Sequence, residues 1–327
     1  MLLQHRQFIN LGNNVIYPLQ LENGKYLLID AGPDFYLDTL DSWHLLTTAL
    51  EKLTIKPSDI EKVLITHAHI DHAGLASKWA HFGATILVNK KDISAVELGN
   101  EHLMLQKKMQ HNDIIYYGFP EYLIENIFSS EKHPQLYWKP CAPEKIKTPK
   151  KTYHLMSGNS LEILEAPGHT PGNLVCFIPQ TGELFSGDTL LPTTIPTPGM
   201  HYISSKNSQE KYIRWPSLPD FIETVKSLQK LKIKCILPGH GTLVDDPEKL
   251  FKRFNTHHQI RAERIRKLLS EHSDTPFGLA KRQYPKIPER RLIQAMIEII
   301  GHLDVLVTSR EVEFSEKNNT LFYASTK

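Results

Sequence analysis

One short segment constrains this chain of 327 residues more than any other feature. His67-Ala68-His69-Ile70-Asp71-His72 follows the apolar run Val63–Ile65, which predicts a buried strand, and the chain is expected to turn there toward a helix starting near Ala73. A strand end holds side chains rigidly, and the loop after it lets several of them converge. Because imidazole and carboxylate are ligands that divalent transition metals prefer, the segment predicts a metal site. The 17 histidines of the chain, well above ordinary usage, agree with metal chemistry.

The apolar runs elsewhere predict a layered α/β domain around this segment. Short strand-like runs alternate with amphipathic helical patterns at 42–53 and 218–231. Residues 92–148 differ in character, because prolines interrupt a stretch rich in aromatic residues, Lys and Glu, and we interpret them as a partly helical insertion. The predicted strands lie at 15–19, 26–29, 63–65, 85–88, 161–164, 174–178 and 233–237.

The pattern changes after Asp245-Asp246-Pro247. Residues 248–271 predict one long basic helix, and two further helices are expected near 276–283 and 288–303. A β-hairpin should follow, with its strands flanking Glu316-Lys317-Asn318-Asn319. The sequence therefore predicts a catalytic domain at 1–247 and a small module of three helices and a hairpin, plausible as a winged helix, at 248–327.

Three later segments offer further metal ligands. Ala166-Pro167-Gly168-His169-Thr170-Pro171-Gly172 follows one predicted strand and forms a tight loop around a single histidine. Phe185-Ser186-Gly187-Asp188 ends the next strand with a carboxylate, and Pro238-Gly239-His240-Gly241 ends the last strand with a histidine. Each segment is weak alone, since Gly-Asp and Gly-His pairs are common in turns. Together they place one ligand type at the end of each of three successive strands.

The four segments, taken in this order, resemble the metallo-β-lactamase superfamily over about residues 12–245, with the insertion at 92–148 outside the resemblance. The resemblance implies an αββα sandwich with two metal ions at one edge of the two sheets. It implies that Asp188 bridges both ions and that Asp30, in Leu28-Ile29-Asp30-Ala31-Gly32, orients a ligand. The remaining assignments are His67, His69 and His169 for the first metal, and Asp71, His72 and His240 for the second.

This ligand set predicts a hydrolase. Two divalent ions contribute a charge of +4, and Asp71, Asp188 and a bridging hydroxide remove three, so the site suits an anionic substrate or a developing oxyanion. No Ser or Cys lies in a recognisable nucleophile setting, so we expect the hydroxide to attack, with Asp71 assigned to catalysis as well as to metal binding. The ligands favour zinc, with iron or manganese as alternatives.

The substrate is less constrained than the metal site. An aspartate at 188, where many β-lactamases of the superfamily have cysteine, and the ending Pro238–Gly241 indicate a branch resembling glyoxalase II and related thioesterases and lactonases. We therefore predict hydrolysis of a thioester, ester or lactone in a small, anionic substrate. The long loop between Asp188 and the helix at 218 supplies three candidate substrate-binding residues, His201, Tyr202 and Arg214.

Three other functions remain open. The C-terminal module resembles the winged-helix extension of one group of these hydrolases, some with endoribonuclease activity, and its basic segment 257–267 could hold RNA during phosphodiester cleavage. Iron-dependent sulfur dioxygenases share much of the ligand set. A nucleic-acid-binding protein with a structural metal is the third alternative, which a bridging carboxylate disfavours because closed structural zinc sites need none.

Composition excludes several classes. A net charge of +2 gives no global attraction to nucleic acid or anionic membrane. No apolar run approaches the roughly 18 residues that a membrane span requires, and the N-terminus lacks the apolar region of a signal peptide. Cys141, Cys176 and Cys235 are too few and too widely spaced for a disulfide framework, so we predict a cytoplasmic protein, with homo-oligomerisation left open.

Overall fold

In the computed structural model, which describes residues 7–37, 40–124, 136–204 and 212–326, the chain passes several times between two compact units. The first unit comprises residues 1–103, 133–196 and 227–250, and the second comprises 104–132, 197–226 and 251–327. The last passage between them lies close to the boundary predicted near 247. The second unit also takes in 104–132 and 197–226, which the sequence predicts to be part of the catalytic domain.

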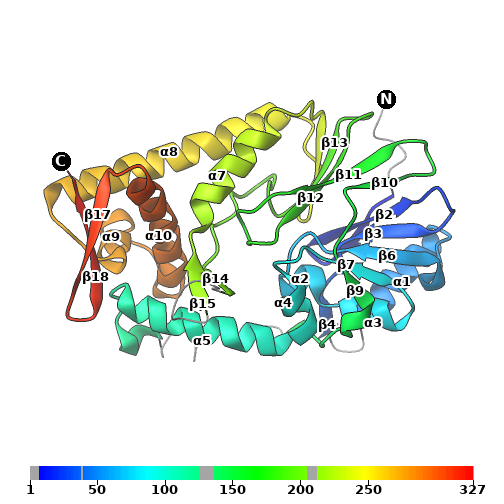
Figure 1. Cartoon of the computed structure of the whole chain (residues 1–327), viewed down its shortest axis with the longest axis horizontal. Helices are drawn as coiled ribbons and strands as arrows, with labels where there is room; N and C mark the ends of the chain where they lie inside the picture. Colours follow the sequence, from blue (N-terminus) through cyan, green and yellow to red (C-terminus); the bar gives the residue numbers. More distant parts are fainter. Residues whose placement is uncertain (1–6, 38–39, 125–135, 205–211, 327) are drawn as a thin grey trace. The chain divides into compact units, whose positions relative to one another are not determined.

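Two sheets form the frame of the first unit (Figure 1). In the first sheet the last four strands in spatial order pair in parallel, and in the second only the last two do, whereas the remaining neighbours are antiparallel. The first sheet has the order β1 (Ile9–Leu11), β2 (Asn14–Gln20), β3 (Tyr26–Ile29), β6 (Ile60–Leu64), β7 (Thr85–Leu87) and β9 (Ile146–Lys147). The second has the order β10 (Thr152–His154), β11 (Ser160–Glu165), β12 (Leu174–Ile178), β13 (Glu183–Gly187) and β16 (Cys235–Pro238). A small third sheet has the order β5 (Leu40–Asp41), β4 (Asp34–Leu37) and β8 (Leu136–Tyr137).

Alternation of side chains along the strands explains the layers of this unit. In β3, Leu27 and Ile29 belong to a core shared with the second sheet, whereas Leu28 belongs to a core shared with the helices. Both faces of the first sheet are therefore covered, as expected for strands that read as continuous apolar runs. The helices of the unit are α1 (Ser42–Lys52), α2 (Ile70–Ala73), α3 (Ala76–His81) and α4 (Ile93–Leu98), with 3₁₀ turns η1 (Pro57–Asp59) and η2 (Pro143–Lys145).

The predicted elements of the first unit are confirmed, with one correction. The strands predicted at 15–19 and 26–29 form the antiparallel hairpin of β2 and β3, which pairs Tyr17 with Ile29 and Gln20 with Tyr26. The helix expected to start near Ala73 instead begins as α2 at Ile70. Asp71 and His72 therefore lie on a helical turn, which turns their side chains together toward one edge of the sheets.

The second unit is mainly helical, and its own core is formed by α5, α8, α9 and α10 with the C-terminal hairpin. The three predicted helices and the hairpin at the C-terminus are confirmed. The loop expected between Asp188 and 218 is wrong in part, because it contains a two-stranded sheet of β14 (His201–Ser204) and β15 (Tyr212–Trp215). The other elements are α5 (Asn100–Tyr116), α7 (Ser217–Leu228), α8 (Pro247–Glu271), α9 (Pro276–Gln283), η3 (Glu289–Arg291), α10 (Leu292–Thr308), β17 (Val312–Lys317) and β18 (Thr320–Ser325).

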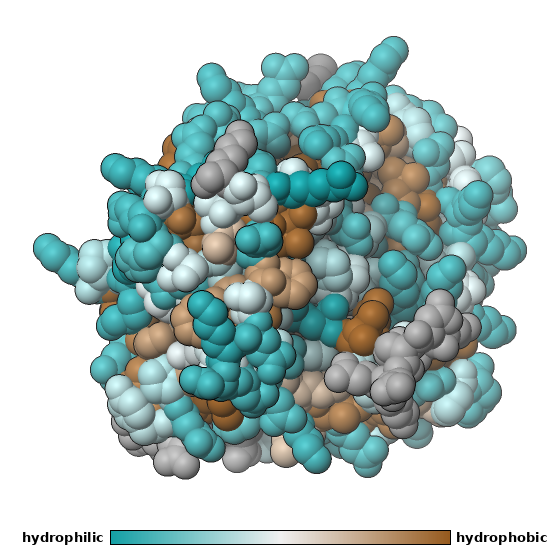
Figure 2. Space-filling view, turned by 60° about the vertical axis from the view of Figure 1, so that its left-hand side comes forward, coloured by the Kyte–Doolittle hydropathy of each residue, from teal (hydrophilic) through white to brown (hydrophobic). Residues whose placement is uncertain are grey.

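The surface agrees with the polar composition. On the face shown in Figure 2, hydrophilic side chains predominate and hydrophobic ones form small, separate groups. Within the described part of the chain, no helix combines the length and the apolar character that crossing a bilayer would require.

Candidate metal centre

Strand direction brings the four predicted ligand segments to one edge of the first unit. β11 runs in the same direction as β13 and β16, so the segments that follow these strands emerge at the same end of the second sheet. Backbone hydrogen bonds join the two sheets at that edge, from Leu174 N to the carbonyl of Thr66 (2.7 Å) and from Val15 N to the carbonyl of Gly239 (2.8 Å). These hydrogen bonds fix the backbone on either side of the predicted ligands.

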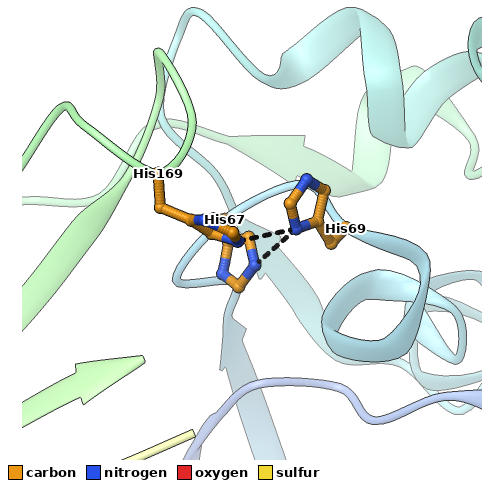
Figure 3. Close-up of side chains that lie close together, drawn as sticks. All are labelled: His67, His69 and His169. Carbon is orange, nitrogen blue, oxygen red and sulfur yellow. Dashed lines mark hydrogen bonds between the residues drawn. The ribbon is translucent and has the colours of Figure 1, made fainter. Parts of the chain in front are cut away.

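The first group of candidate ligands is His67, His69 and His169 (Figure 3). His69 Nδ1 lies 3.0 Å from His67 Nε2 and 3.0 Å from His169 Nε2. Nitrogen ligands bind zinc at about 2.0–2.1 Å, and tetrahedral geometry then separates them by about 3.4 Å. The three nitrogens thus converge closely enough to share one ion, although His67 and His169 come from segments about 100 residues apart.

The second group is Asp71, His72 and His240. His240 Nε2 lies 3.1 Å from His72 Nε2 and 3.2 Å from Asp71 Oδ2, and His72 Nε2 lies 3.5 Å from the same carboxylate oxygen. These are the residues that the resemblance assigned to the second metal. The helical turn of α2 supplies two of them, and the end of β16 supplies the third.

Asp188 contacts both groups. Its Oδ1 lies 3.4 Å from His72 Nε2, and its Oδ2 lies 3.5 Å from His240 Nε2 and 3.8 Å from His169 Nε2. Asp188 Oδ1 is buried, yet none of the described residues donates a hydrogen bond to it. A buried carboxylate oxygen without a donor costs free energy unless a cation lies beside it. The position and the state of Asp188 therefore fit a carboxylate that bridges two cations.

The charges of the cluster suit metal binding. Burial would raise the pKa of Asp188, but His72 and the other histidines lower it to about 2. Burial would likewise raise the pKa of Asp71, and His72 and His240 bring it below its ordinary value. Burial and neighbouring imidazoles lower the pKa of His67 well below its ordinary value. The carboxylates are thus ionised and His67 is neutral at neutral pH, which are the forms that coordinate metals. Burial would lower the pKa of His72, but Asp30, Asp188 and Asp71 raise it well above its ordinary value, so a metal ion would displace a proton from this ring.

Asp30 supports one ligand from each group. His72 Nδ1 donates to Asp30 Oδ2 (2.8 Å), and Thr66 donates to the same carboxylate through its backbone N–H (2.8 Å) and its hydroxyl (3.0 Å). Since the Thr66 hydroxyl proton points to Asp30, its oxygen accepts from His67 Nδ1 at 3.1 Å. Asp30 thus contacts Nδ1 of His72 directly and Nδ1 of His67 through Thr66, which fixes the orientation of both rings. That Asp30 orients metal ligands stays a prediction.

Replacing Asp30 by asparagine is expected to weaken metal binding and activity by about 10- to 100-fold, the usual effect of losing a group that orients metal ligands. An asparagine amide cannot accept hydrogen bonds from His72 and from both donors of Thr66. Competition with a chelator would measure the metal affinity. Asp59→Asn is the matched control, because Asp59 is partly exposed beside Lys25 at the opposite end of β6. Equal affinities of the Asp30 and Asp59 variants would contradict the assignment.

The structure adds supporting residues that the sequence analysis missed. His240 Nδ1 donates to the carbonyl of Asn13 (2.9 Å), and Asn14 Nδ2 lies 3.4 Å from Asp71 Oδ2. Neither residue belongs to a recognisable motif. Two glycines of the ligand segments also support the site by leaving space for its side chains. A Cβ at Gly187 would stand 2.7 Å from the Thr66 hydroxyl, and one at Gly239 would stand 2.8 Å from Asp188.

The three predicted substrate-binding residues lie in the second unit, on β14 and β15. Tyr202 is buried, and its hydroxyl donates to Asp113 (2.7 Å). Arg214 makes two hydrogen bonds to Asp304, at 2.8 and 2.5 Å. These contacts give Tyr202 and Arg214 a structural role in the second unit, and binding of substrate by them or by His201 stays a prediction.

Residues 11–240 match the family model of the metallo-beta-lactamase superfamily. The match spans well over half of the chain, which therefore belongs to this superfamily of metallo-hydrolases.

Three relatives illustrate the likeness. The chain is 26% identical to "Probable metallo-hydrolase YqjP" of Bacillus subtilis, covering 97% of this chain and 94% of that protein. A metallo-beta-lactamase family protein from Thermus thermophilus has a similar solved structure, with a TM-score of 0.71, 22% identity and 98% of each chain covered. A beta-lactamase domain protein from Burkholderia ambifaria has a TM-score of 0.72 at 16% identity, covering 97% of this chain and 88% of that one. Both structures confirm the predicted mixed α/β fold with a helical C-terminal region.

Proposed function

We propose that the protein hydrolyses an acyl bond (thioester, ester or lactone) in a small, anionic substrate, with two divalent metal ions. One observation carries the proposal: two groups of three donor atoms lie on either side of Asp188 at one sheet edge. The histidine and aspartate donors suit zinc first, with iron or manganese as alternatives. The glyoxalase II-like branch remains part of the proposal, supported by Asp188 and by the loop that carries His240.

The residues of the chain would divide the work. His67, His69 and His169 would hold one ion, Asp71, His72 and His240 the other, and Asp188 both. When bound, such a pair of ions lowers the pKa of a water molecule and polarises the bond under attack. Only Asp71 and Asp188 contribute negative charge among these seven side chains, so the loaded site keeps a net positive charge that favours an anionic substrate.

The RNA alternative loses support in the second unit. Several cations that it would need are already paired within that unit, since Arg261 lies 3.1 Å from Glu298, Arg266 lies 2.6 Å from Glu311 and Arg282 lies 2.5 Å from Glu271. Phosphate contacts by these side chains would require the loss of the ion pairs. The winged-helix likeness of residues 248–327 rests on the order of three helices and a hairpin, and we propose that this module serves the enzyme without nucleic acid.

A cytoplasmic location is the last part of the proposal. Cys141, Cys176 and Cys235 are buried and carry free thiols. Buried, unpaired thiols are typical of proteins in reducing compartments.

A substrate panel tests the proposal. We expect the purified protein, with its metal content measured by elemental analysis, to hydrolyse thioesters or lactones and to leave phosphodiesters and RNA intact. Asp71→Ala is the control, because it removes one donor of the second group and should reduce both metal content and turnover. Cleavage of RNA without thioester or lactone turnover would favour the alternative. Undiminished hydrolysis by a metal-depleted Asp71→Ala protein would overturn the mechanism.

A further inference from the structure

Asp92 is a buried carboxylate outside the seven ligands. It occupies the position before the first residue of α4 (Ile93–Leu98), where an aspartate usually accepts a hydrogen bond from its own helix. Asp92 makes no such bond. Its Oδ2 instead accepts from the backbone N–H of Ala68 at 3.1 Å, and the backbone of Gly172 lies against the same carboxylate.

The approach of Gly172 is unusually close. A Cβ at this position would stand 2.3 Å from Asp92 Cγ and Oδ1 and 2.6 Å from Oδ2. Real Cβ atoms essentially never occur at such distances, and the Ala68 N–H holds the carboxylate in place. The glycine that ends the segment Pro167–Gly172 therefore allows the loop of His169 to lie directly on Asp92.

The two contacts join the segments that carry the first ligand group. Ala68 lies between His67 and His69, and Gly172 follows His169 by three residues. We propose that Asp92 is a positioning residue that fastens these two segments together and so sets the metal affinity of the His67, His69 and His169 group. The inference rests on the proposed metal-binding role of that group. The second group takes its donors from α2 and the end of β16. The contacts of Asp92 with Ala68 and Gly172, called the clamp below, should therefore affect metal binding at the first group only.

Two substitutions alter the clamp from opposite sides. Asp92→Asn keeps one acceptor oxygen but replaces the other by an amide NH₂, which cannot accept a hydrogen bond. Gly172→Ala inserts a methyl group where the carboxylate lies. We expect each to weaken binding at the first group by about 10- to 100-fold, as for other groups that orient metal ligands. Because both act through one contact, the double variant should lose less than the sum of the single losses.

The measurement is release of Co²⁺ from the loaded full-length protein to a competing chelator, followed by the visible absorption of the bound ion. His169→Ala and His240→Ala provide reference spectra for damage to the first and second groups. Asp92→Asn is expected to lose Co²⁺ with the spectrum of His169→Ala and to keep the ion that His240→Ala loses. Val96→Ala is the matched control, since it truncates a buried side chain of the same helix that has no hydrogen-bonding side chain.

The outcomes separate this inference from the proposed function. Tight retention of both ions by Asp92→Asn, with loss of one ion by His169→Ala, would overturn the clamp alone. Equal weakening at both groups, or the same weakening in Val96→Ala, would assign the effect to general destabilisation and also overturn it. Full retention of Co²⁺ by His169→Ala and His240→Ala would overturn the proposed metal centre itself.

Discussion

Asp188→Asn is expected to lower hydrolytic activity by about 1000-fold and to leave the protein with fewer than two metal ions. The carboxylate of Asp188 lies 3.4 to 3.8 Å from ligand nitrogens of both groups, so its charge acts on both positions. Metal-assisted stabilisation of a transition state amounts to several kcal/mol, and each 1.4 kcal/mol changes a rate about tenfold. Asparagine preserves the volume of the side chain and removes the negative charge.

Metal content by elemental analysis and kcat on the best substrate of the panel would measure this effect. Glu183→Gln is the matched control, because Glu183 is a buried carboxylate at the opposite end of the same strand, β13. The control should retain both ions even if it costs stability. Full metal content and activity in Asp188→Asn would show that the bridging position is unnecessary.

Much of the centre could be predicted because its signals are local. His67, His69, Asp71 and His72 lie within six residues, and each remaining ligand follows a recognisable strand in a segment rich in glycine or proline. Strand ends of one sheet edge meet in space, so the order of the segments implied their convergence. Asp30 was reached only through the family resemblance, and its hydrogen bond to His72 could not have been derived from spacing.

The missed features depend on tertiary contacts between distant segments. Asp92 reads as an ordinary residue before a helix, and only the fold brings it to Ala68 and Gly172. Prolines and polar residues in 193–215 predict a loop, and only the pairing of two segments within it makes β14 and β15 a sheet. Membership of 104–132 in the second unit was equally hidden, since contacts such as Gln106 with Tyr202 join residues about 96 positions apart.

A buried pair of histidines in the second unit lies apart from the metal centre and has its own consequence. His258 on α8 and His302 on α10 are both buried, and His258 Nδ1 lies 3.2 Å from His302 Nε2. His302 Nδ1 donates to the carbonyl of Glu298 (2.8 Å), so in the neutral pair His302 Nε2 accepts from His258 Nδ1. A proton added to either ring would place a charge beside the other imidazole, His257 and Arg261 in the core.

This pair should make the protein less stable in acid. Burial, reinforced by the neighbouring histidine and only partly opposed by Glu298, lowers the pKa of His258 to about 3, and burial lowers that of His302 to about 4. In the unfolded chain both pKa values return to 6.5. Between pH 6.5 and 4 the unfolded state therefore binds protons that the folded state excludes. The free energy of unfolding should fall by about 1.4 kcal/mol per histidine for each pH unit in this interval.

Urea denaturation followed by circular dichroism at pH 7, 6 and 5, with a chelator present throughout, would measure the slope. His258→Leu/His302→Leu replaces the pair by apolar side chains. It is expected to reduce the slope of the free energy of unfolding against pH by the contribution of about two protons. The single variant His272→Leu is the matched control, because the His272 side chain is 61% exposed and should leave the slope unchanged. The metal ligands titrate equally in all three proteins and cancel in the comparison. An identical slope in the double variant would show that the pair does not cause the acid sensitivity. A flattened slope would assign the acid sensitivity to these two histidines in the core of the second unit.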